Sequence, residues 1–376
     1  HRDLHLSIRR QRQMCIRDRY IIVTQTYPPR IGGMQNVMTS ISKRLSSIED
    51  THVFPDHFLS KKNGYINSKL HIHNNFSPKI FRSFIKKYLV NKIYKDNDVV
   101  ICDSWKSIKA VPSKVKKIFV LAHGQEFLST KKKFGQIKKS LNRASCIICS
   151  SSYTKNLITE FKVTDTQKIV IPPTYSIGVP SEKNTKFRAK SKLVSLLTIC
   201  RLEDRKGIIP VLKCLSELNS NKFLKPFLWN ICGEGPQKNK IQNLIKGLGL
   251  SEQVKLIGKI SGDSKVDFIK KSDLFIMPSY KVKNSIEGFG ISYIEAAAYG
   301  IPSIAGIEGG VVDAVNHSRS GWCVNPLSLK ELSDTLMEAI NNEKKRKEYG
   351  SQAKKQFMHY FLGEKVFRKL VDTISI

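Results

Sequence analysis

Two glutamates eight positions apart flank a glycine turn in the last third of the chain. Glu287 precedes the turn at 288–290, and Glu295 falls one helical turn inside a helix expected to begin near Ile291. Glycine lets a backbone approach a ligand closely, and the free N–H groups at a helix amino terminus favour an anion. The segment therefore predicts an anion site, with Glu295 placed to accept hydrogen bonds from a sugar diol and Glu287 nearer the reacting end. The alternative is that Glu287 caps the helix and Glu295 is solvated.

A charged loop adds cations to the same region. Residues 200–207 follow a β-branched run at 193–199 and open a helix, so Arg201 and Lys206 fall at the carboxyl edge of a predicted sheet. Two cations at such an edge can neutralise a diphosphate without a metal ion. Arg205 is an alternative carrier of this charge, and a loop that is simply solvated is the other alternative.

Three further motifs follow predicted strands. The turn Gly233-Glu234-Gly235 ends the run at 227–231 and could wall a nucleotide base pocket. Gly32-Gly33 lies between the run at 20–24 and a helix-spaced series of apolar residues. His123 comes directly after another apolar run and before a glycine, which favours a site over a place in the core.

The elements that must position these motifs alternate between buried strands and amphipathic helices. The β-branched or apolar runs lie at 20–24, 98–102, 117–121, 146–149, 193–199, 227–231, 254–257 and 274–277. Such alternation predicts an α/β protein with two Rossmann-like, doubly wound parallel-sheet domains that face each other across a cleft. Ligands of such sheets bind beyond the carboxyl ends of the strands, where all the motifs above fall.

Together the motifs resemble the retaining nucleotide-sugar glycosyltransferases of family 4, which have the GT-B fold. The resemblance runs roughly from Tyr20 to the end of the chain. It implies that Glu295 binds the donor ribose hydroxyls and that Glu287 lies beside the donor sugar. It also implies that Arg201 and Lys206 hold the diphosphate and offset the charge of the leaving group.

The same resemblance assigns the remaining motifs. Gly32-Gly33 and His123 match the first-domain elements that face donor and acceptor. The backbone amides of Phe289, Gly290 and Ile291 would reach sugar hydroxyls and phosphate.

The domain organisation expected on this basis has four parts. Residues 1–19 hold six arginines and no lysine, unlike the lysine-rich remainder, and are expected to be non-native or disordered. Residues 20–185 form an N-terminal acceptor-side domain, and residues 186–353 form the nucleotide-sugar-binding domain, with a polar linker at 181–186 before it. Residues 354–376 form a helix that crosses back to the first domain.

The predicted reaction needs no metal and no other cofactor. Cleavage of a sugar–phosphate bond leaves negative charge on the diphosphate, which the two cations and the helix terminus would stabilise. The nine histidines and eight cysteines show no zinc-like pairing. Since no positioned nucleophile is evident, front-face attack by the acceptor hydroxyl is the hypothesis for retention.

Composition bounds the remaining possibilities. With 40% hydrophobic residues the chain is too apolar for disorder, and charged residues interrupt every stretch long enough to span a bilayer. The spread of cysteines predicts reduced thiols and a cytoplasmic setting, with Cys146 and Cys149 as core residues.

The net charge of +33 raises the question of an anionic partner. The segment 79–95 interleaves lysines with apolar residues at helical spacing, which is typical of an interfacial helix on anionic lipid. The alternative is that this helix packs on the first domain. The apolar positions are Phe81, Phe84, Ile85, Tyr88, Leu89 and Ile93.

These observations predict a glycosyltransferase that moves a sugar from a nucleotide diphosphate sugar to a glycan or lipid-linked acceptor in bacterial cell-envelope polysaccharide synthesis. It would act at the cytosolic face of the membrane. A nucleotide-sugar epimerase of the same fold is the nearer alternative. A nucleic-acid-binding protein is the more distant one, and no motif for nucleic acid is present.

Overall fold

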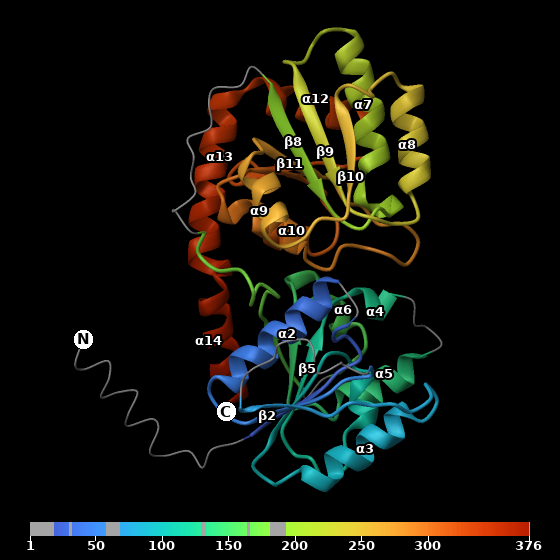
Figure 1. Cartoon of the computed structure of the whole chain (residues 1–376), viewed down its shortest axis with the longest axis vertical. Coiled ribbons are helices and arrows are strands. Elements are labelled where there is room, and N and C mark those ends of the chain that lie inside the picture. Colours follow the sequence, from blue (N-terminus) through green and yellow to red (C-terminus); the bar gives the residue numbers. More distant parts are fainter. Residues whose placement is uncertain are drawn as a thin grey trace, which may run out of the picture.

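The computed structural model describes residues 19–29, 32–57, 68–128, 133–163, 166–180 and 193–375. These residues form two α/β domains stacked along the long axis of the molecule (Figure 1). The predicted linker at 181–186 and the expected boundary at 185/186 lie outside the described residues, as do residues 1–18 of the head segment.

The first domain is built on a seven-stranded sheet in which every described pairing is parallel. Its strands are β1 (Tyr20–Val23), β2 (Thr51–Phe54), β3 (Leu70–Ile72), β4 (Val99–Cys102), β5 (Ile118–Ala122), β6 (Cys146–Cys149) and β7 (Gln167–Val170). The order is β3-β2-β1-β4-β5-β6-β7. The four predicted runs of this half are all strands, whereas β2, β3 and β7 are short strands that the sequence pattern did not single out.

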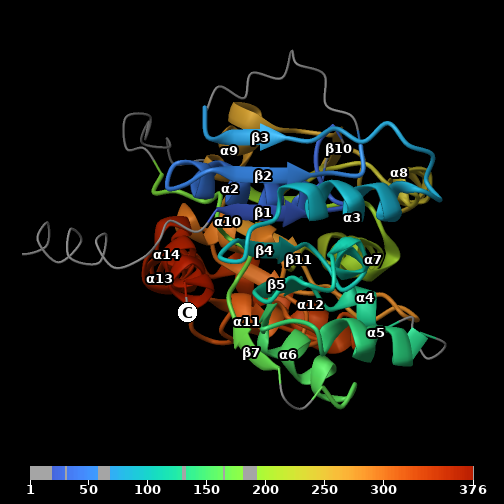
Figure 2. The same ribbon diagram turned by 90° about the horizontal axis from the view of Figure 1, so that it is seen from below.

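Helices cover both faces of this sheet (Figure 2). They are α2 (Gly33–Ser46), α3 (Arg82–Ile93), the 3₁₀ turn η1 (Ser107–Ala110), α4 (Gln125–Leu128), α5 (Phe134–Leu141) and α6 (Ser152–Thr159). One apolar core joins α2 to the sheet, and a second joins α3, η1 and α5 to its other face. Burial on both faces explains why the central strands β1, β4, β5 and β6 read as continuous apolar runs.

The second domain repeats the plan with six strands whose described pairings are all parallel. Its strands are β8 (Val194–Ile199), β9 (Phe227–Cys232), β10 (Val254–Gly258), β11 (Leu274–Met277), β12 (Ser303–Ala305) and β13 (Gly321–Cys323). Its helices are α7 (Ile208–Ser220), α8 (Lys238–Gly247), α9 (Gly262–Lys270), α10 (Ile291–Ala298), α11 (Val311–Ala314) and α12 (Leu329–Asn341), with the 3₁₀ turn η4 (Asp204–Lys206). The prediction of two doubly wound parallel-sheet domains is confirmed.

In each sheet the strands that follow one another along the chain are added first on one side and then, after a single switch point, on the other side. In the first sheet β1 lies between β2 and β4, and in the second sheet β8 lies between β9 and β11. The loops after the two strands at such a switch point diverge and leave a crevice, where ligands of this fold class bind. The loops after β1, β4, β8 and β11 are therefore the places to look for a site.

The end of the chain ties the domains together. Helix α13 (Glu343–Gln356) runs along the second domain, a π-helical turn η5 (Phe357–Phe361) follows, and α14 (Gly363–Ile374) continues beside the first domain (Figure 1). Val366, Leu370 and Ile374 of α14 are buried in the first-domain core that includes α2.

Within the described residues, no helix combines the length and the apolar character needed to cross a bilayer. The cysteines of the described part of the chain are all unpaired, and Cys146 and Cys149 are buried in β6.

Candidate active site

Glu287 lies in a compact cluster of charges at the edge of the second sheet. Its Oε2 accepts a hydrogen bond from the guanidinium of Arg205 at 2.7 Å and forms an ion pair with Nζ of Lys206. Lys206 is only 7% exposed and ends η4, after which Gly207 adopts a left-handed conformation with φ 74°. A Cβ at Gly207 would lie 2.1 Å from a backbone carbonyl oxygen, so the turn that aims Lys206 requires glycine.

The electrostatics of the cluster keep Glu287 charged. Burial by itself raises the pKa of this carboxyl group, but the charges and hydrogen bonds of Lys206 and Arg205 outweigh burial and hold the pKa below its ordinary value. The carboxylate is therefore ionised at neutral pH. It orients two cations that an incoming anion would otherwise have to order itself.

Arg201 does not join this cluster. Its side chain is 72% exposed and pairs with Glu203, with 3.2 Å between Nε and Oε1. Glu203 also accepts a hydrogen bond from Nε of Arg205 at 3.0 Å. Among the described residues Arg201 makes no hydrogen bond or ion pair with Glu287, so the structure brings Lys206 and Glu287 together with Arg205 rather than Arg201.

The glycine turn leads into α10 at the predicted position, Ile291. Gly290 has φ 92°, and a Cβ there would lie 2.4 Å from the ring of Tyr293. The N-cap residue is Gly290 itself, which has no side chain that could cap the first amides of α10. Phe289 is buried and packs edge-to-face on Phe361 of η5, with 5.7 Å between the ring centroids. Its side chain therefore anchors the turn to the hinge between the domains.

Glu295 is partly buried on α10 and pairs with a residue that the sequence analysis did not select. Its Oε1 lies 2.5 Å from Nζ of Lys265 on α9. Glu295 is therefore held in an ion pair and is not freely solvated.

The turn after β9 packs closely on the loop after β8. A Cβ on Gly233 would lie 1.8 Å from the carbonyl oxygen of Cys200, and one on Gly235 would lie 2.4 Å from that of Leu202. Glu234 between them is exposed and pairs with Lys238 at 2.8 Å. The two glycines let these loops share one edge of the sheet.

The first domain contacts the same glycine turn. A Cβ on Gly288 would lie 2.1 Å from the carbonyl oxygen of His123, and Ser151 donates a hydrogen bond to the carbonyl oxygen of Gly288 at 2.8 Å. A Cβ on Gly33 would lie 3.9 Å from Cδ1 of Ile291. Gly32, in extended conformation, precedes it as the N-cap of α2. The amino ends of α2 and α10 thus approach each other across the domains.

His123 is held by its ring and its backbone. Nε2 lies 3.1 Å from the carbonyl oxygen of Asp103, and the backbone N–H donates to Glu126 at 2.8 Å. Because a carbonyl oxygen only accepts, Nε2 carries the proton of this bond. Nδ1 is buried and has no hydrogen-bond partner among the described residues. As the unprotonated nitrogen of the ring, it could accept a hydrogen bond from a ligand that reaches it.

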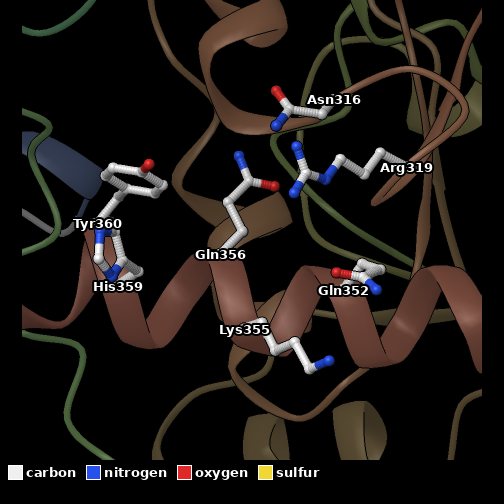
Figure 3. Close-up of a pocket in the computed structure, with 7 residues that line it drawn as sticks. All are labelled: Asn316, Arg319, Gln352, Lys355, Gln356, His359 and Tyr360. Atoms are coloured by element: carbon white, nitrogen blue, oxygen red, sulfur yellow. The ribbon is translucent and has the colours of Figure 1, made fainter.

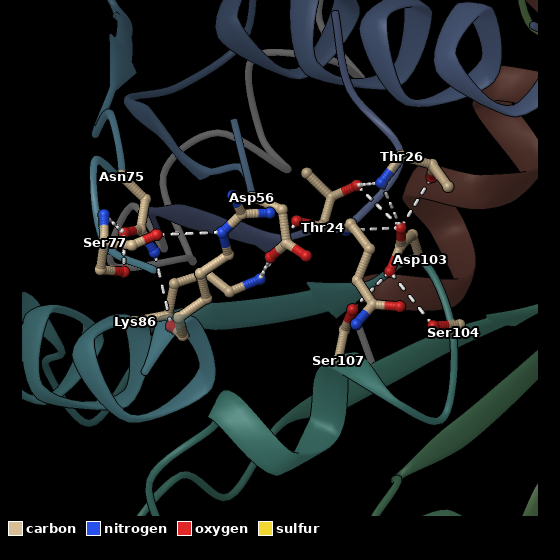
Figure 4. Close-up of polar contacts among 11 residues, drawn as sticks. Thr24, Thr26, Asp56, Asn75, Ser77, Lys86, Asp103, Ser104 and Ser107 are labelled. Carbon is tan, nitrogen blue, oxygen red and sulfur yellow. Dashed lines mark hydrogen bonds and ion pairs between the residues drawn. The ribbon is translucent and has the colours of Figure 1, made fainter. Parts of the chain in front are cut away.

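Asp103 itself was missed by the sequence analysis. This carboxylate follows β4 and gathers hydrogen bonds from the loop after β1 (Figure 4). The sequence does show that Asp103 directly follows one apolar run and that Thr24 and Thr26 lie at the end of another.

A pocket of about 400 Å³ lies beside α13 and η5 and is lined by none of the residues of the charge cluster (Figure 3). It is lined by Asn316, Arg319, Gln352, Lys355, Gln356, His359 and Tyr360. None of these residues belongs to the predicted site. Among the described residues no group of three or more His, Cys, Asp or Glu side chains is arranged to hold a metal ion.

The arrangement can bind an anion and stabilise a negatively charged leaving group. Two cations and an uncapped helix amino terminus converge on the second-domain side, and a histidine with a free nitrogen lies on the first-domain side. Two doubly wound domains with a site between them define the GT-B class of glycosyltransferases.

Comparison with known proteins agrees with this class. The crystal structure of Anabaena HepE in complex with UDP and glucose aligns with a TM-score of 0.76 over 95% of this chain and 99% of that one, at 16% sequence identity. An uncharacterized glycosyltransferase of Methanocaldococcus jannaschii is 26% identical over 94% of this chain and 98% of its own length. A GDP-mannose-dependent phosphatidylinositol monomannoside mannosyltransferase of Mycobacterium tuberculosis is 26% identical over 38% of this chain and 37% of its own length.

The second half of the chain matches a known family. Residues 181–356 match the family model described as glycosyl transferases group 1. With the relatives above, this match shows that the chain is a glycosyltransferase with the GT-B fold.

Proposed function

We propose that this glycosyltransferase moves a sugar from a nucleoside diphosphate sugar to a glycan or lipid-linked acceptor, with retention at the anomeric carbon and without a metal ion. The observation that carries the proposal is the partly buried contact of Lys206 and Arg205 with Glu287 next to the amino terminus of α10. A diphosphate of charge about −2 would replace solvent at these cations and form charge-assisted hydrogen bonds with groups that are already oriented.

The two sides of the cleft would divide the work. On the second domain Glu295 would accept hydrogen bonds from the ribose, and the amides of the glycine turn would reach the phosphates. On the first domain Nδ1 of His123 and the amino end of α2 would face the sugar and the acceptor. HepE, with UDP and glucose bound, supports a nucleotide sugar as donor.

A donor screen tests the proposal most directly. Thermal shift with UDP-, GDP- and ADP-sugars, each with EDTA and with Mg²⁺, should give stabilisation by one nucleotide that EDTA does not remove. Lys206→Met should lose that stabilisation. A requirement for Mg²⁺, or no response to any nucleotide sugar, would contradict the proposal. Proton NMR of the product, which reports the anomeric configuration, tests retention and thereby membership of family 4.

The acceptor is proposed from chemistry and from relatives. The mycobacterial relative is named for a lipid acceptor, which supports a lipid-linked or glycan acceptor in cell-envelope synthesis. Such acceptors sit at the cytosolic face of a membrane, so we place the enzyme there and expect no nucleic acid partner.

The structure offers a surface for that membrane. Five large apolar side chains on and just before α3 are strongly exposed, from 57% for Phe81 to 87% for Ile80. The set consists of Phe76, Ile80, Phe81, Phe84 and Tyr88. Lys79, Lys87 and Lys92 are exposed among or near them. Aromatic side chains flanked by lysines suit the headgroup region of anionic lipid.

One lysine of the predicted stripe has another role. Lys86 is 3% exposed, because its amino group turns inward to Asp56 and to the carbonyl oxygen of Thr24. Vesicle sedimentation tests the surface: Phe84→Ser with Tyr88→Ser should release the protein from phosphatidylglycerol vesicles. Equal binding to anionic and neutral vesicles would contradict the electrostatic part.

A further inference from the structure

Asp103 has an unusual number of hydrogen bonds for one buried carboxylate. It is 2% exposed and follows β4 at the switch point of the first sheet. Its Oδ2 accepts from the hydroxyl of Thr24 at 2.9 Å, from the amides of Gln25 and Thr26 at 2.8 and 2.9 Å, and from the hydroxyl of Thr26 at 2.7 Å. One oxygen atom therefore accepts four hydrogen bonds from residues 24–26, at the start of the loop after β1.

The other oxygen faces its own loop. Oδ1 accepts from the hydroxyls of Ser107 at 2.5 Å and Ser104 at 3.4 Å (Figure 4). Among the described residues no Lys, Arg or His side chain forms an ion pair with Asp103. Its charge is stabilised by neutral donors alone, and all of these belong to the protein.

The same residue also orients His123. Its backbone carbonyl oxygen accepts from Nε2 of the imidazole at 3.1 Å, which leaves Nδ1 free. The loop after β1 and the loop after β5 both take their positions from Asp103.

The loop after β1 continues to the amino end of α2. Tyr27, fully buried, ties it to that helix through a 2.8 Å hydrogen bond between its hydroxyl group and that of Ser42. Lys86 holds the carbonyl oxygen of Thr24 at 3.2 Å from the side of α3. Helix α2 itself begins at Gly33, which approaches Ile291 of the second domain.

We propose that Asp103 is a positioning residue for sugar transfer. It fixes the start of the loop after β1, which Tyr27 ties to α2, together with the imidazole of His123, so that the first-domain side of the site is preorganised before the donor binds. Burial of a carboxylate costs free energy that a core of apolar residues would not, and a site that must hold its geometry is where such a cost is useful. The inference rests on the proposed transferase function.

The chain provides a matched control on the same strand. Asp98, at the other end of β4, is also 2% exposed and accepts hydrogen bonds from Arg19 and from the amide of Lys95. Asp103→Asn and Asp98→Asn make the same chemical change at the cleft end and at the far end of one strand. Thr26→Val removes a single donor to Oδ2 and serves if Asp103→Asn folds poorly.

The experiment separates binding from turnover. UDP and GDP binding would be measured by titration calorimetry, and kcat from the release of nucleoside diphosphate from UDP-glucose and GDP-mannose. Asp103→Asn should lower kcat roughly tenfold, because a small misplacement of positioning groups is costly. Its nucleotide Kd should stay within about twofold of wild type, because the second domain holds the diphosphate. The kcat of Thr26→Val should also fall, but by less than that of Asp103→Asn. Asp98→Asn should leave kcat unchanged.

Two other results would overturn the inference. Wild-type kcat in Asp103→Asn, or an equal loss of kcat in Asp98→Asn, would make Asp103 merely structural. If wild-type protein neither binds nor turns over any nucleotide sugar, the transferase proposal fails first, and that outcome is visible before any variant is made.

Discussion

Two carboxylates, partly buried Glu287 and buried Asp103, lie in opposite domains and are stabilised in different ways. Glu287 on the second domain is held by two cations, Lys206 and Arg205. Asp103 on the first domain is held by hydroxyl and amide groups only. One carboxylate therefore lies in a cluster of charged groups, and the other in a cluster of neutral donors.

The difference indicates what each side of the cleft can do during a reaction. The cations at Glu287 can turn toward a diphosphate as its charge develops, because Lys206 and Arg205 each keep N–H donors that their carboxylate partners Glu287 and Glu203 do not use. The donors at Asp103 are all used within the protein and can only hold geometry. Charge stabilisation and positioning are thus separated between the domains, and this division can be tested by substitution.

The largest effect should come from Lys206. Lys206→Met removes the most buried cation of the cluster, and we expect kcat/KM to fall roughly 1000-fold, with weaker nucleotide binding, since this charge acts on the leaving group. Kinetics and calorimetry with UDP and GDP measure both. Lys347→Met, at an exposed lysine paired with Glu343, makes the same change far from the cleft and should be silent. A modest loss of kcat/KM in Lys206→Met would contradict the view that the second domain supplies the charge stabilisation.

A smaller loss is expected at the carboxylate. Glu287→Gln keeps the shape but no longer fixes the two cations, and kcat should fall roughly 100-fold. Nucleotide binding should be maintained or strengthened, because the cations lose their internal competitor. Weaker nucleotide binding in Glu287→Gln would contradict competition between this carboxylate and the diphosphate for the two cations.

The pH dependence of stability should distinguish Glu287 directly. Its pKa in the folded protein lies below the ordinary carboxyl value, so its contribution is complete above that ordinary value and is lost as the pH falls through the folded pKa. Glu287→Gln should be less stable than wild type by about 3 kcal/mol at pH 7. The difference in free energy of unfolding between wild type and Glu287→Gln should vanish in acid. Chemical denaturation from pH 7 to 3 measures this difference. A gap independent of pH would contradict the charged pairing.

The smallest effect is expected at Arg201. Its guanidinium is exposed and pairs with Glu203, so Arg201→Ala should change kcat/KM by less than about threefold, as for an exposed ion pair. Arg205→Ala in the same loop should cost far more. If the order of the two were reversed, Arg201 would have to move inward when the donor binds.

The fold was predictable because the central strands are buried on both faces. Runs such as Ile21–Val23 and Leu274–Met277 contain almost nothing but apolar residues. The edge strand β3 was not predictable, because its partly exposed residues alternate without a clear apolar run. The start of α10 at Ile291 was predictable because Gly290 marks it.

The site was predictable in part. Glycine spacing identified the turn at Glu287 and the loop that carries Lys206. The choice between Arg201 and Arg205 could not be made, because the 3₁₀ turn at 204–206 decides which side chain points inward. Asp103 was missed because its donors lie about 78 residues earlier in the chain, and only the pairing of β1 with β4 brings them together. Retention and metal independence remain predictions.

The crossover helix has a consequence for synthesis. Val366, Leu370 and Ile374 complete the hydrophobic core that β1 and α2 begin. A ribosome translates this chain from the other end, so the earliest-made lobe stays unfinished until its last partner emerges from the exit tunnel. The first-domain core is then completed only after Ile374 has been synthesised, and a chain cut short before Val366 would yield two lobes of which the older one is the less stable.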